Sequence, residues 1–306
     1  WKVGINMNTF IEITGLNLEL LIFLAIDITI AIILLGAMRF ISGLSAKVNS
    51  TDELAKEDNF AFGISVAGSV AALGIVLTGA ISGENADSYL MEIIGMASYG
   101  FFGLILIKIG RIFHDRFALN QIDKNAQIKS RNIAVGIVDA SGAIATAIVI
   151  RAVLLWVYGL DINTFTAITA GFVVSQAMLV LVTRIKERQY AANNKNNSMQ
   201  KAFAEGHVAL AIRYAGQAIS TALAVTAASH FLTYSPDTLL VNLVGWLVFG
   251  MIMTLLVALL TSIAKRLVLM GINLVEEVDQ QHNIGVASVE MAISISIALI
   301  LTALMS

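Results

Sequence analysis

The stretch Asn132-Ile-Ala-Val-Gly-Ile-Val-Asp-Ala-Ser141 decides the fold, because closely similar stretches occur three more times in the chain. They begin at Asn59, His207 and Asn283, so that successive copies start 73, 75 and 76 residues apart. In each copy a polar segment ends at Asn or His, small residues follow two, four and nine positions later, and an apolar run completes the unit. A regular period of this size indicates an internally repeated architecture.

The composition predicts a membrane protein. Hydrophobic residues make up 58 % of the 306 residues and charged residues 13 %, whereas soluble domains are nearer half apolar and a quarter charged. The mean hydropathy is +0.83, and the apolar residues form unbroken runs that suit a lipid bilayer. A net charge of −2 gives no indication of nucleic-acid binding, and the absence of cysteine excludes disulfides and thiolate metal sites.

Eight apolar runs have the length of about 20 residues that a helix needs to cross a bilayer, and only helices satisfy their backbone there without closing a barrel. We therefore predict an all-α, polytopic membrane protein with eight transmembrane helices, built from four parallel two-helix repeats. The predicted spans are about 18–43, 59–82, 88–111, 132–158, 164–182, 207–231, 236–265 and 283–305.

The repeats group into two larger units. Residues 1–16 form an N-terminal lead, 17–158 a first four-helix unit and 159–306 a second one. The chain begins at Trp1, so the presence of a preceding segment or signal peptide stays open. The polar segment 112–131 is expected to lie partly in the membrane interface, and the longest polar stretch, 183–206, is expected to have a mobile loop at its core, 193–198. The seventh helix is expected to begin at Pro236 and could continue along the surface to His282.

Positive charge predicts the orientation. The loops after the first, third, fifth and seventh spans carry fourteen Lys and Arg residues, whereas loops 83–87, 159–163 and 232–237 carry none. Excess positive charge marks the cytoplasmic side, so both termini are expected on the periplasmic side of a bacterial inner membrane. The four hairpins then share one orientation, unlike the inverted repeats of many transporters.

Small residues indicate how the even-numbered helices pack. Counted from the Asn or His as position zero, positions +2, +9 and +13 form one stripe and positions +4 and +15 a second. Two such faces let two neighbours approach closely, so we expect the even helices to be the inner set. The motif residues Asn59, Asn132, His207 and Asn283 either cap their helices or line a cytoplasmic vestibule, and His207 is either pH-sensitive or a simple surface residue.

Five ionisable residues fall within predicted spans, where such residues are costly and commonly functional: Asp27, Asp139, Arg151, Arg213 and Glu290. Asp139 and Glu290 lie 151 residues apart, each seven positions beyond its motif Asn. Two interpretations stay open. Either the acids bind or relay a cation along a pathway tuned by Arg213, or Arg213 pairs with one acid and holds the repeats in register. An ion pair between Asp27 and Arg151 on the outer side is a further hypothesis.

Nothing in the sequence indicates an enzyme. The metalloprotease, nucleophile-elbow and phosphate-loop patterns are missing, and the four histidines lack the spacing of metal ligands. We therefore expect no catalytic residue, no cofactor and no metal site.

The pattern Asn-x-Ala-x-Gly/Ala, followed by a small residue five positions later and preceded by a charged amphipathic stretch, resembles the YjfL-like bacterial inner-membrane proteins, a family of unknown function (domain of unknown function 350). The resemblance covers about 17–158 and 159–306, which implies two family units fused in tandem. Asn59, Asn132 and Asn283 match the family residue, whereas His207 departs from it. The resemblance also implies genes neighbouring phage-shock-type membrane-remodelling proteins and polyamine-ligase-like enzymes.

Two functions are compatible with these observations. The first is a small ion- or solute-conducting unit with Asp139 and Glu290 at its centre. The second is a non-conducting structural membrane subunit that scaffolds a partner complex, for example in a membrane-stress response. Expected partners are the lipid bilayer, anionic lipids at the basic loops, and either further copies of the chain or another membrane or cytoplasmic protein.

Overall fold

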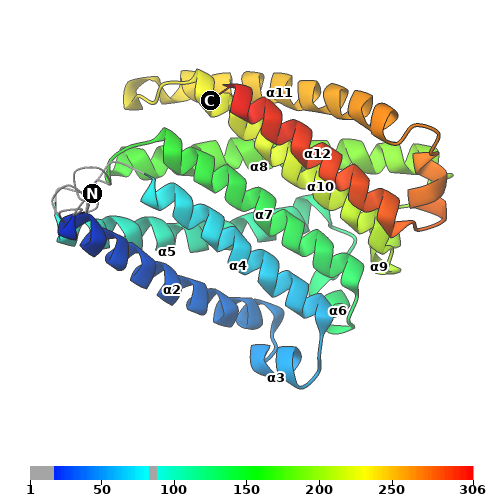
Figure 1. Cartoon of the computed structure of the whole chain (residues 1–306), viewed down its shortest axis with the longest axis horizontal. Coiled ribbons are helices and arrows are strands. Elements are labelled where there is room, and N and C mark those ends of the chain that lie inside the picture. Colours follow the sequence, from blue (N-terminus) through cyan, green and yellow to red (C-terminus); the bar gives the residue numbers. More distant parts are fainter. Residues whose placement is uncertain (1–16, 83–87, 306) are drawn as a thin grey trace, which may run out of the picture.

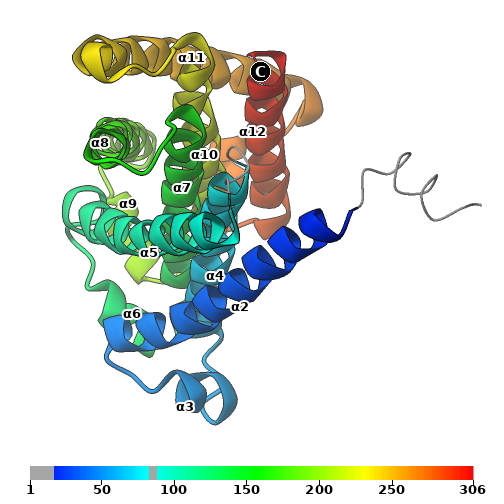
Figure 2. The ribbon, with the colours of Figure 1, turned by 90° about the vertical axis from the view of Figure 1, so that its left-hand side faces the viewer.

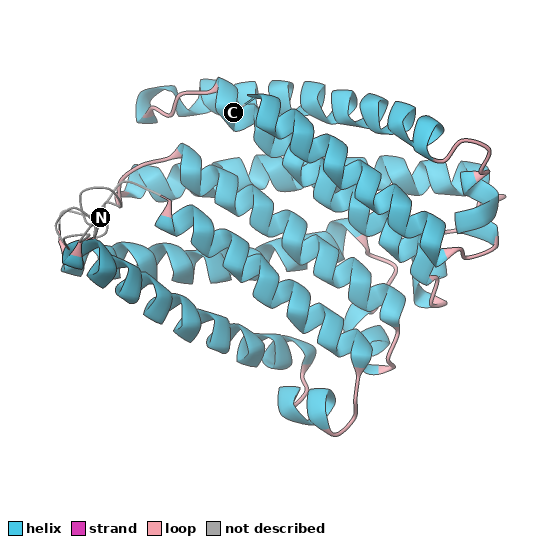
Figure 3. Cartoon of the chain, viewed as in Figure 1, coloured by secondary structure: helices cyan, strands magenta, loops and turns pink. Residues whose placement is uncertain are grey.

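The computed structural model describes residues 17–82 and 88–305, and all regular structure within them is helical (Figure 3). Eight helices in these ranges are long and apolar enough to span a membrane. The predicted all-α polytopic fold is therefore confirmed, while the lead 1–16 and the turn 83–87 lie outside the described residues. The spanning helices are α2 (Leu18–Ala46), α4 (Phe60–Ile81), α5 (Tyr89–Phe113), α7 (Ile133–Trp156), α8 (Ile162–Asn193), α10 (Val208–Thr226), α11 (Leu239–Val268) and α12 (Ile284–Met305).

Short helical segments connect these spans. Before each even helix of the repeat lies one such segment, which replaces the simple polar loop: α3 (Ser50–Ala55), α6 (Lys124–Lys129), α9 (Met199–Ala204) and the π-helix η4 (Val275–Gln280). The others are the π-helix η1 (His114–Ala118) after α5 and the 3-10 helices η2 (Ala227–Phe231) and η3 (Pro236–Thr238).

Two connections differ from the prediction. Helix α8 runs on to Asn193, eleven residues past its predicted end, because the segment after Val182 contains good helix formers and an Arg184–Glu187 ion pair of 2.6 Å one turn apart. Helix α11 ends at Val268 and does not continue to His282. Gly271, with φ +84°, turns the chain away just beyond that end.

All four repeats point the same way. Helices α4, α7, α10 and α12 start at one end of the molecule, at the right in Figure 1, where α3, α6, α9 and η4 also lie. We call this the basic end, because the Lys- and Arg-rich connections gather there. The opposite end holds the tight connections between α7 and α8 and between α10 and α11.

The even helices form a single row in the order α4, α7, α10, α12, which we call the even row, while α5, α8 and α11 cover one face of it (Figure 2). Adjacent members approach backbone to backbone: a Cβ added to Gly68 would lie 2.4 Å from the Cβ of Ala140, and one added to Gly136 would lie 2.7 Å from the carbonyl oxygen of Ala61. Small residues make this approach possible. Helices α4, α7 and α10 are the inner set, as expected, whereas α12 ends the row and is mostly exposed.

Candidate functional site

The four motif residues cap the even helices. The side chains of Asn59, Asn132 and Asn283 accept hydrogen bonds from the backbone N–H three residues later, at 3.1, 3.2 and 3.1 Å. His207 does the same through Nδ1, which accepts from the Leu210 N–H at 3.1 Å. A cap satisfies one of the four N–H groups that a helix start leaves unpaired. The capping interpretation therefore accounts for all four residues, including the histidine.

The caps also connect successive repeats. Asn59 Nδ2 donates to the carbonyl oxygen of Ile128, at the end of α6, at 3.0 Å. Asn132 Nδ2 donates to the carbonyl oxygens of Phe203 and Ala204, at the end of α9, at 3.0 and 2.9 Å. His207 Nε2 lies 3.2 Å from the carbonyl oxygen of Asp279 in η4. Asn59, Asn132 and His207 thus each fasten their helix to the short segment of the following repeat.

In the first unit, Asp139 is the centre of a buried ion cluster. Its carboxylate accepts from Arg111 of α5 at 2.7 Å and from Lys124 of α6 at 2.8 Å, and Ser65 of α4 donates to it as well. Lys124 also contacts Asp115 at 2.6 Å. The side chain of Asp139 is only 2 % exposed. Two cations and a hydroxyl therefore satisfy a carboxylate that would otherwise be costly to bury.

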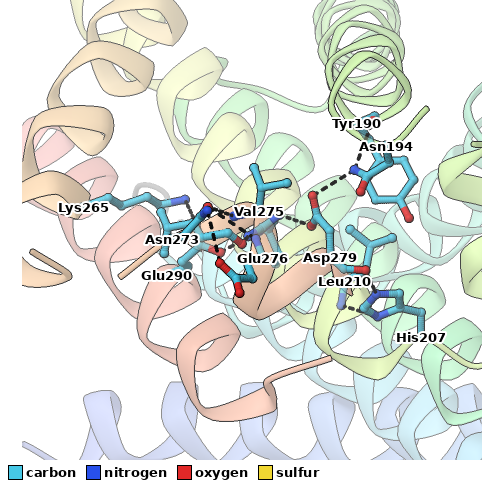
Figure 4. Close-up of polar contacts among 12 residues, drawn as sticks. Tyr190, Asn194, His207, Leu210, Lys265, Asn273, Val275, Glu276, Asp279 and Glu290 are labelled. Atoms are coloured by element: carbon cyan, nitrogen blue, oxygen red, sulfur yellow. Dashed lines mark hydrogen bonds and ion pairs between the residues drawn. The ribbon is translucent and has the colours of Figure 1, made fainter. Parts of the chain in front are cut away.

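In the second unit, Glu290 is the centre of the matching cluster (Figure 4). It accepts from Arg213 Nε of α10 at 2.6 Å and from Lys265 Nζ of α11 at 3.0 Å. Arg213 also pairs with Asp279 of η4 and donates to the Leu274 carbonyl oxygen at 2.8 Å. Asp279 in turn accepts from Asn194 at the end of α8 at 3.0 Å. The cluster joins five segments at the basic end: α8, α10, α11, η4 and α12.

The two clusters are built on one plan. In both, the acid at position +7 of one even helix contacts position +6 of the preceding even helix, which is Ser65 in the first unit and Arg213 in the second. In both, the odd helix of the same repeat contributes a cation to the acid: Arg111 in the first unit and Lys265 in the second. The third repeat has Tyr214 at position +7, and its hydroxyl lies 2.5 Å from His114 Nε2.

The remaining predicted site residues, Asp27 and Arg151, do not contact each other. Arg151 Nε donates to Thr78 Oγ1 at 3.0 Å, and the described residues contain no ion pair between Arg151 and Asp27. Asp27 instead faces the carboxyl group of Glu92 on α5. The hypothesis of an outer Asp27–Arg151 pair is therefore wrong, because α4 and α5 pack against both α2 and α7 and hold these two helices apart. Arg213 does pair with one of the two acids, Glu290.

Polar cavities adjoin the second cluster. One of about 370 Å³ is lined by Tyr190, Arg213, Asp279 and Glu290 among others. A second, of about 220 Å³, lies between α8, α10, α11 and α12 and is rich in hydroxyl groups: Ser220, Thr221, Thr254, Thr261, Ser262 and Ser294. Lys186, Gln217 and Ser262 line both cavities. The polar space therefore continues from the basic end into the membrane-spanning part.

Sequence reasoning missed the partners of the two acids. Arg111, Lys124 and Lys265 were counted only as loop charges, and Asp279 was not singled out. A signal was nevertheless available. Each cation lies close enough to the membrane depth of an acid for its side chain to reach that acid, because long Arg and Lys side chains extend back along a helix. The partners lie on different helices and are distant along the chain, as Arg111 and Asp139 are 28 positions apart.

Comparison with known proteins places the chain in a family. The family model described as Domain of Unknown Function (DUF350) matches residues 14–154 and again residues 159–305. No curated protein and no solved structure matches the chain. The two matched regions each contain two repeats and one of the acid clusters. The chain therefore belongs to the DUF350 family and carries two units of it in tandem.

Proposed function

We propose that this protein conducts a small ion or polar solute across the bacterial inner membrane, with the basic end in the cytoplasm. The supporting observation is the hydroxyl-lined cavity of about 220 Å³ that begins beside the Glu290 cluster and lies among four spanning helices. Hydroxyl groups facing a cavity inside a membrane protein are typical of a polar pathway.

The acids themselves are poor candidates for a cation site. Asp139 and Glu290 each contact two cations at 3.0 Å or less, so neither carboxylate carries free negative charge. A cation would have to displace Arg or Lys from a buried position, which leaves that residue unpaired at high cost. The acids therefore serve to hold the cations in place, and the pathway is formed by the groups beside them.

The charge of the cavity wall favours an anion or a neutral polar solute. Lys186 and Lys265 line the hydroxyl-rich cavity, and no Asp or Glu does so. Lys265 pairs with Glu290, whereas Lys186 donates to Gln189 at 3.2 Å and forms no ion pair among the described residues. Lys186 therefore supplies the uncompensated positive charge that would attract a negatively charged solute into the cavity.

Flux through proteoliposomes tests this proposal. Purified protein would be reconstituted and halide, nitrate and potassium fluxes measured for the wild type, for Lys186→Gln and for Lys201→Gln. We expect anion flux to fall about tenfold in Lys186→Gln, equivalent to about 1.4 kcal/mol at the rate-limiting step. Lys201 is a suitable control because it lies at the basic end with a 75 % exposed side chain paired to Glu205, and its variant should conduct normally.

Potassium flux exceeding anion flux would contradict the preference for anions. Unchanged flux in both Lys186→Gln and the cavity-filling variant Ser262→Leu would argue against conduction through this cavity. The competing function, a structural subunit that scaffolds a partner, is favoured by the saturation of both acid clusters, which lock helices together without leaving a reactive charge. An intact protein with no flux that copurifies with a stoichiometric partner would support that alternative.

A further inference from the structure

Neighbouring helices of the even row meet through equivalent positions of the repeat. In two of the three interfaces, position +9 of one helix faces position +8 of the next. Gly68 (+9) meets Ala140 (+8) between α4 and α7, and Gly216 (+9) meets Met291 (+8) between α10 and α12. In the α4–α7 interface, Ala61 (+2) of α4 also meets Gly136 (+4) of α7. The two faces of the interface are different, so each even helix has one face of each kind.

Among the described residues 17–82 and 88–305, one face of each kind is left without its partner at the ends of the row. We call Gly285, Ala292 and Ser296 the free α12 face, and all three are exposed. The nine equivalent residues of α4, α7 and α10 are all buried. We call Gly63, Ala67 and Gly74 the free α4 face. A Cβ added to Gly74 would meet nothing within 4 Å, and one added to Gly63 would meet only Leu54, at 3.7 Å.

A hydrogen-bond pattern stops at the same place. Asn59, Asn132 and His207 each contact a carbonyl oxygen in the short segment of the following repeat. Asn283 caps α12 and donates to Glu277 of its own segment at 2.8 Å, and the described residues give it no contact with a further short segment. The corresponding carbonyl, four residues before the first motif residue, is that of Ala55 at the end of α3, which is exposed.

The neighbours of helix α2 also show that the even row stops at α4. Helices α5, α8 and α11 each pack against two members of the even row, α5 against α4 and α7, α8 against α7 and α10, and α11 against α10 and α12. Helix α2 packs against α4 and α5, so the even helix that would precede α4 is missing from its surroundings. Only Asp27, Met38, Ser42 and Gly43 of α2 are buried.

We propose that a second copy of this chain completes the row, with the free α12 face of one copy packed against the free α4 face of the next. The occupant is a second copy because the two free faces carry the same repeat positions that meet within the chain, between α4 and α7 and between α10 and α12. The contact is head-to-tail, so a rotation that closes on itself would join the copies into a ring. Such a ring would be lined or walled by the even helices.

The chemistry of the free faces suits this contact. Positions +6 of α12 and +7 of α4 are Val289 and Val66, where the first and third interfaces carry Ser65–Asp139 and Arg213–Glu290. The new contact therefore buries no ionisable pair. Packing of small residues and a hydrogen bond from Asn283 to the Ala55 carbonyl of the second copy would stabilise it, as helix association in lipid relies on close packing and polar contacts.

Disulfide crosslinking tests the contact directly, because the chain contains no cysteine. By the repeat numbering, Ala292 (+9) of one copy meets Ala67 (+8) of the next. Differently tagged Ala67→Cys and Ala292→Cys chains would be coexpressed and oxidised in membranes. We expect a two-chain covalent product joining the two tags, at a yield about tenfold above the control, since a disulfide requires Cβ atoms within about 4.5 Å. The control pair is Ala67→Cys with Leu255→Cys, whose side chain on α11 is 71 % exposed.

A bulky substitution gives a second readout. Ala292→Trp should leave the single chain folded, because Ala292 is exposed there, and should reduce the mass of the particle in lipid nanodiscs to that of one chain. Leu255→Trp should leave the wild-type mass unchanged. A one-chain mass for the wild type, as expected if lipid or an unrelated protein covers the faces, would overturn the proposal. So would equal crosslinking of the control pair, or a multimer that persists in Ala292→Trp.

Discussion

At the residue scale, Asp139 lies on α7 and Glu290 on α12, but the cations that neutralise their carboxylates lie on other segments. Asp139 contacts Arg111 and Lys124, and Glu290 contacts Arg213 and Lys265. A buried ion cluster is not in itself a strong source of stability, because desolvation offsets most of the attraction. Removing one member of the cluster is nevertheless destabilising, because the remaining charges stay buried without a partner.

This asymmetry can be measured at Asp139. Asp139→Ala should lower the free energy of unfolding by about 3–5 kcal/mol, because Arg111 and Lys124 would remain buried without their acid. Ser65→Ala, which removes only a hydroxyl donor from the same carboxylate, should cost about 1 kcal/mol. Denaturant unfolding of the detergent-solubilised protein measures both, and equal losses in the two variants would contradict the cluster as described.

His207 makes a pH-dependent contribution that the other three motif residues cannot make. Burial lowers the pKa of His207 below 6.5, with the stacked His282 acting in the same direction, against the opposing effect of Asp279. The neutral ring is favoured in the folded protein, and its Nδ1 must be unprotonated to accept from Leu210. Its contribution to stability is therefore complete above pH 6.5 and declines as the pH falls below that value.

The matched variant for this prediction is His207→Asn, which restores the residue of the other repeats. Thermal unfolding between pH 7.5 and pH 5 should show a steeper loss of stability for the wild type than for His207→Asn. The Asn variant keeps the cap but has no titratable group, so the difference between the two curves isolates the histidine. Parallel curves would show that His207 does not titrate differently in the folded and unfolded states.

At the element scale, the fold depends on the close approach of the even helices. Their capping residues, Asn or His, set where each helix begins, and small residues let the helices touch along their length. The odd helices differ, since their bulkier side chains cover the row from one face, and α2 remains largely exposed. The helices of the row are therefore expected to be far less tolerant of added volume than the helices around it.

Two glycine substitutions test this difference. Gly68→Val places side-chain atoms where a Cβ alone would already lie 2.4 Å from Ala140, so it should destabilise the protein by about 1–3 kcal/mol or more. Gly36→Ala on α2, where a Cβ meets nothing within 4 Å, should be neutral or stabilise by up to about 1 kcal/mol through helix propensity. Unfolding midpoints of the two variants against wild type give the comparison, and a tolerated Gly68→Val would contradict the close packing.

At the scale of the whole molecule, the four hairpins share one direction and place their charged connections at one end (Figure 1). The prediction from the positive-inside rule is that this end is cytoplasmic. Cysteines introduced at Asn196, in the connection after α8, and at Asp237, in η3 at the opposite end, can be labelled in a chain that has none of its own. We expect a membrane-impermeant maleimide applied to intact cells to label Asp237→Cys only, and Asn196→Cys only after lysis. The reverse pattern would invert the orientation.

The sequence by itself determined the number of spans, their helical nature and the repeat, because a bilayer admits few alternatives for an apolar run of about 20 residues. It also indicated the tight packing of the even helices and their caps, since small residues and Asn act within the segment that carries them. Polar helix ends were less predictable: α8 extends to Asn193 and α11 stops at Val268, because outside the bilayer local propensity and a single glycine decide where a helix ends.

Only the tertiary structure decided which charges meet and where the row of even helices stops. Ion partners lie on different helices, and flexible Lys and Arg side chains reach across several ångströms, so spacing along the chain does not select among them. The same applies to the free faces of α4 and α12: all four repeats carry both kinds of face, and only their order in space leaves one of each uncovered. Long-range contact, rather than local pattern, therefore sets both the site and the surface through which copies of the chain could associate.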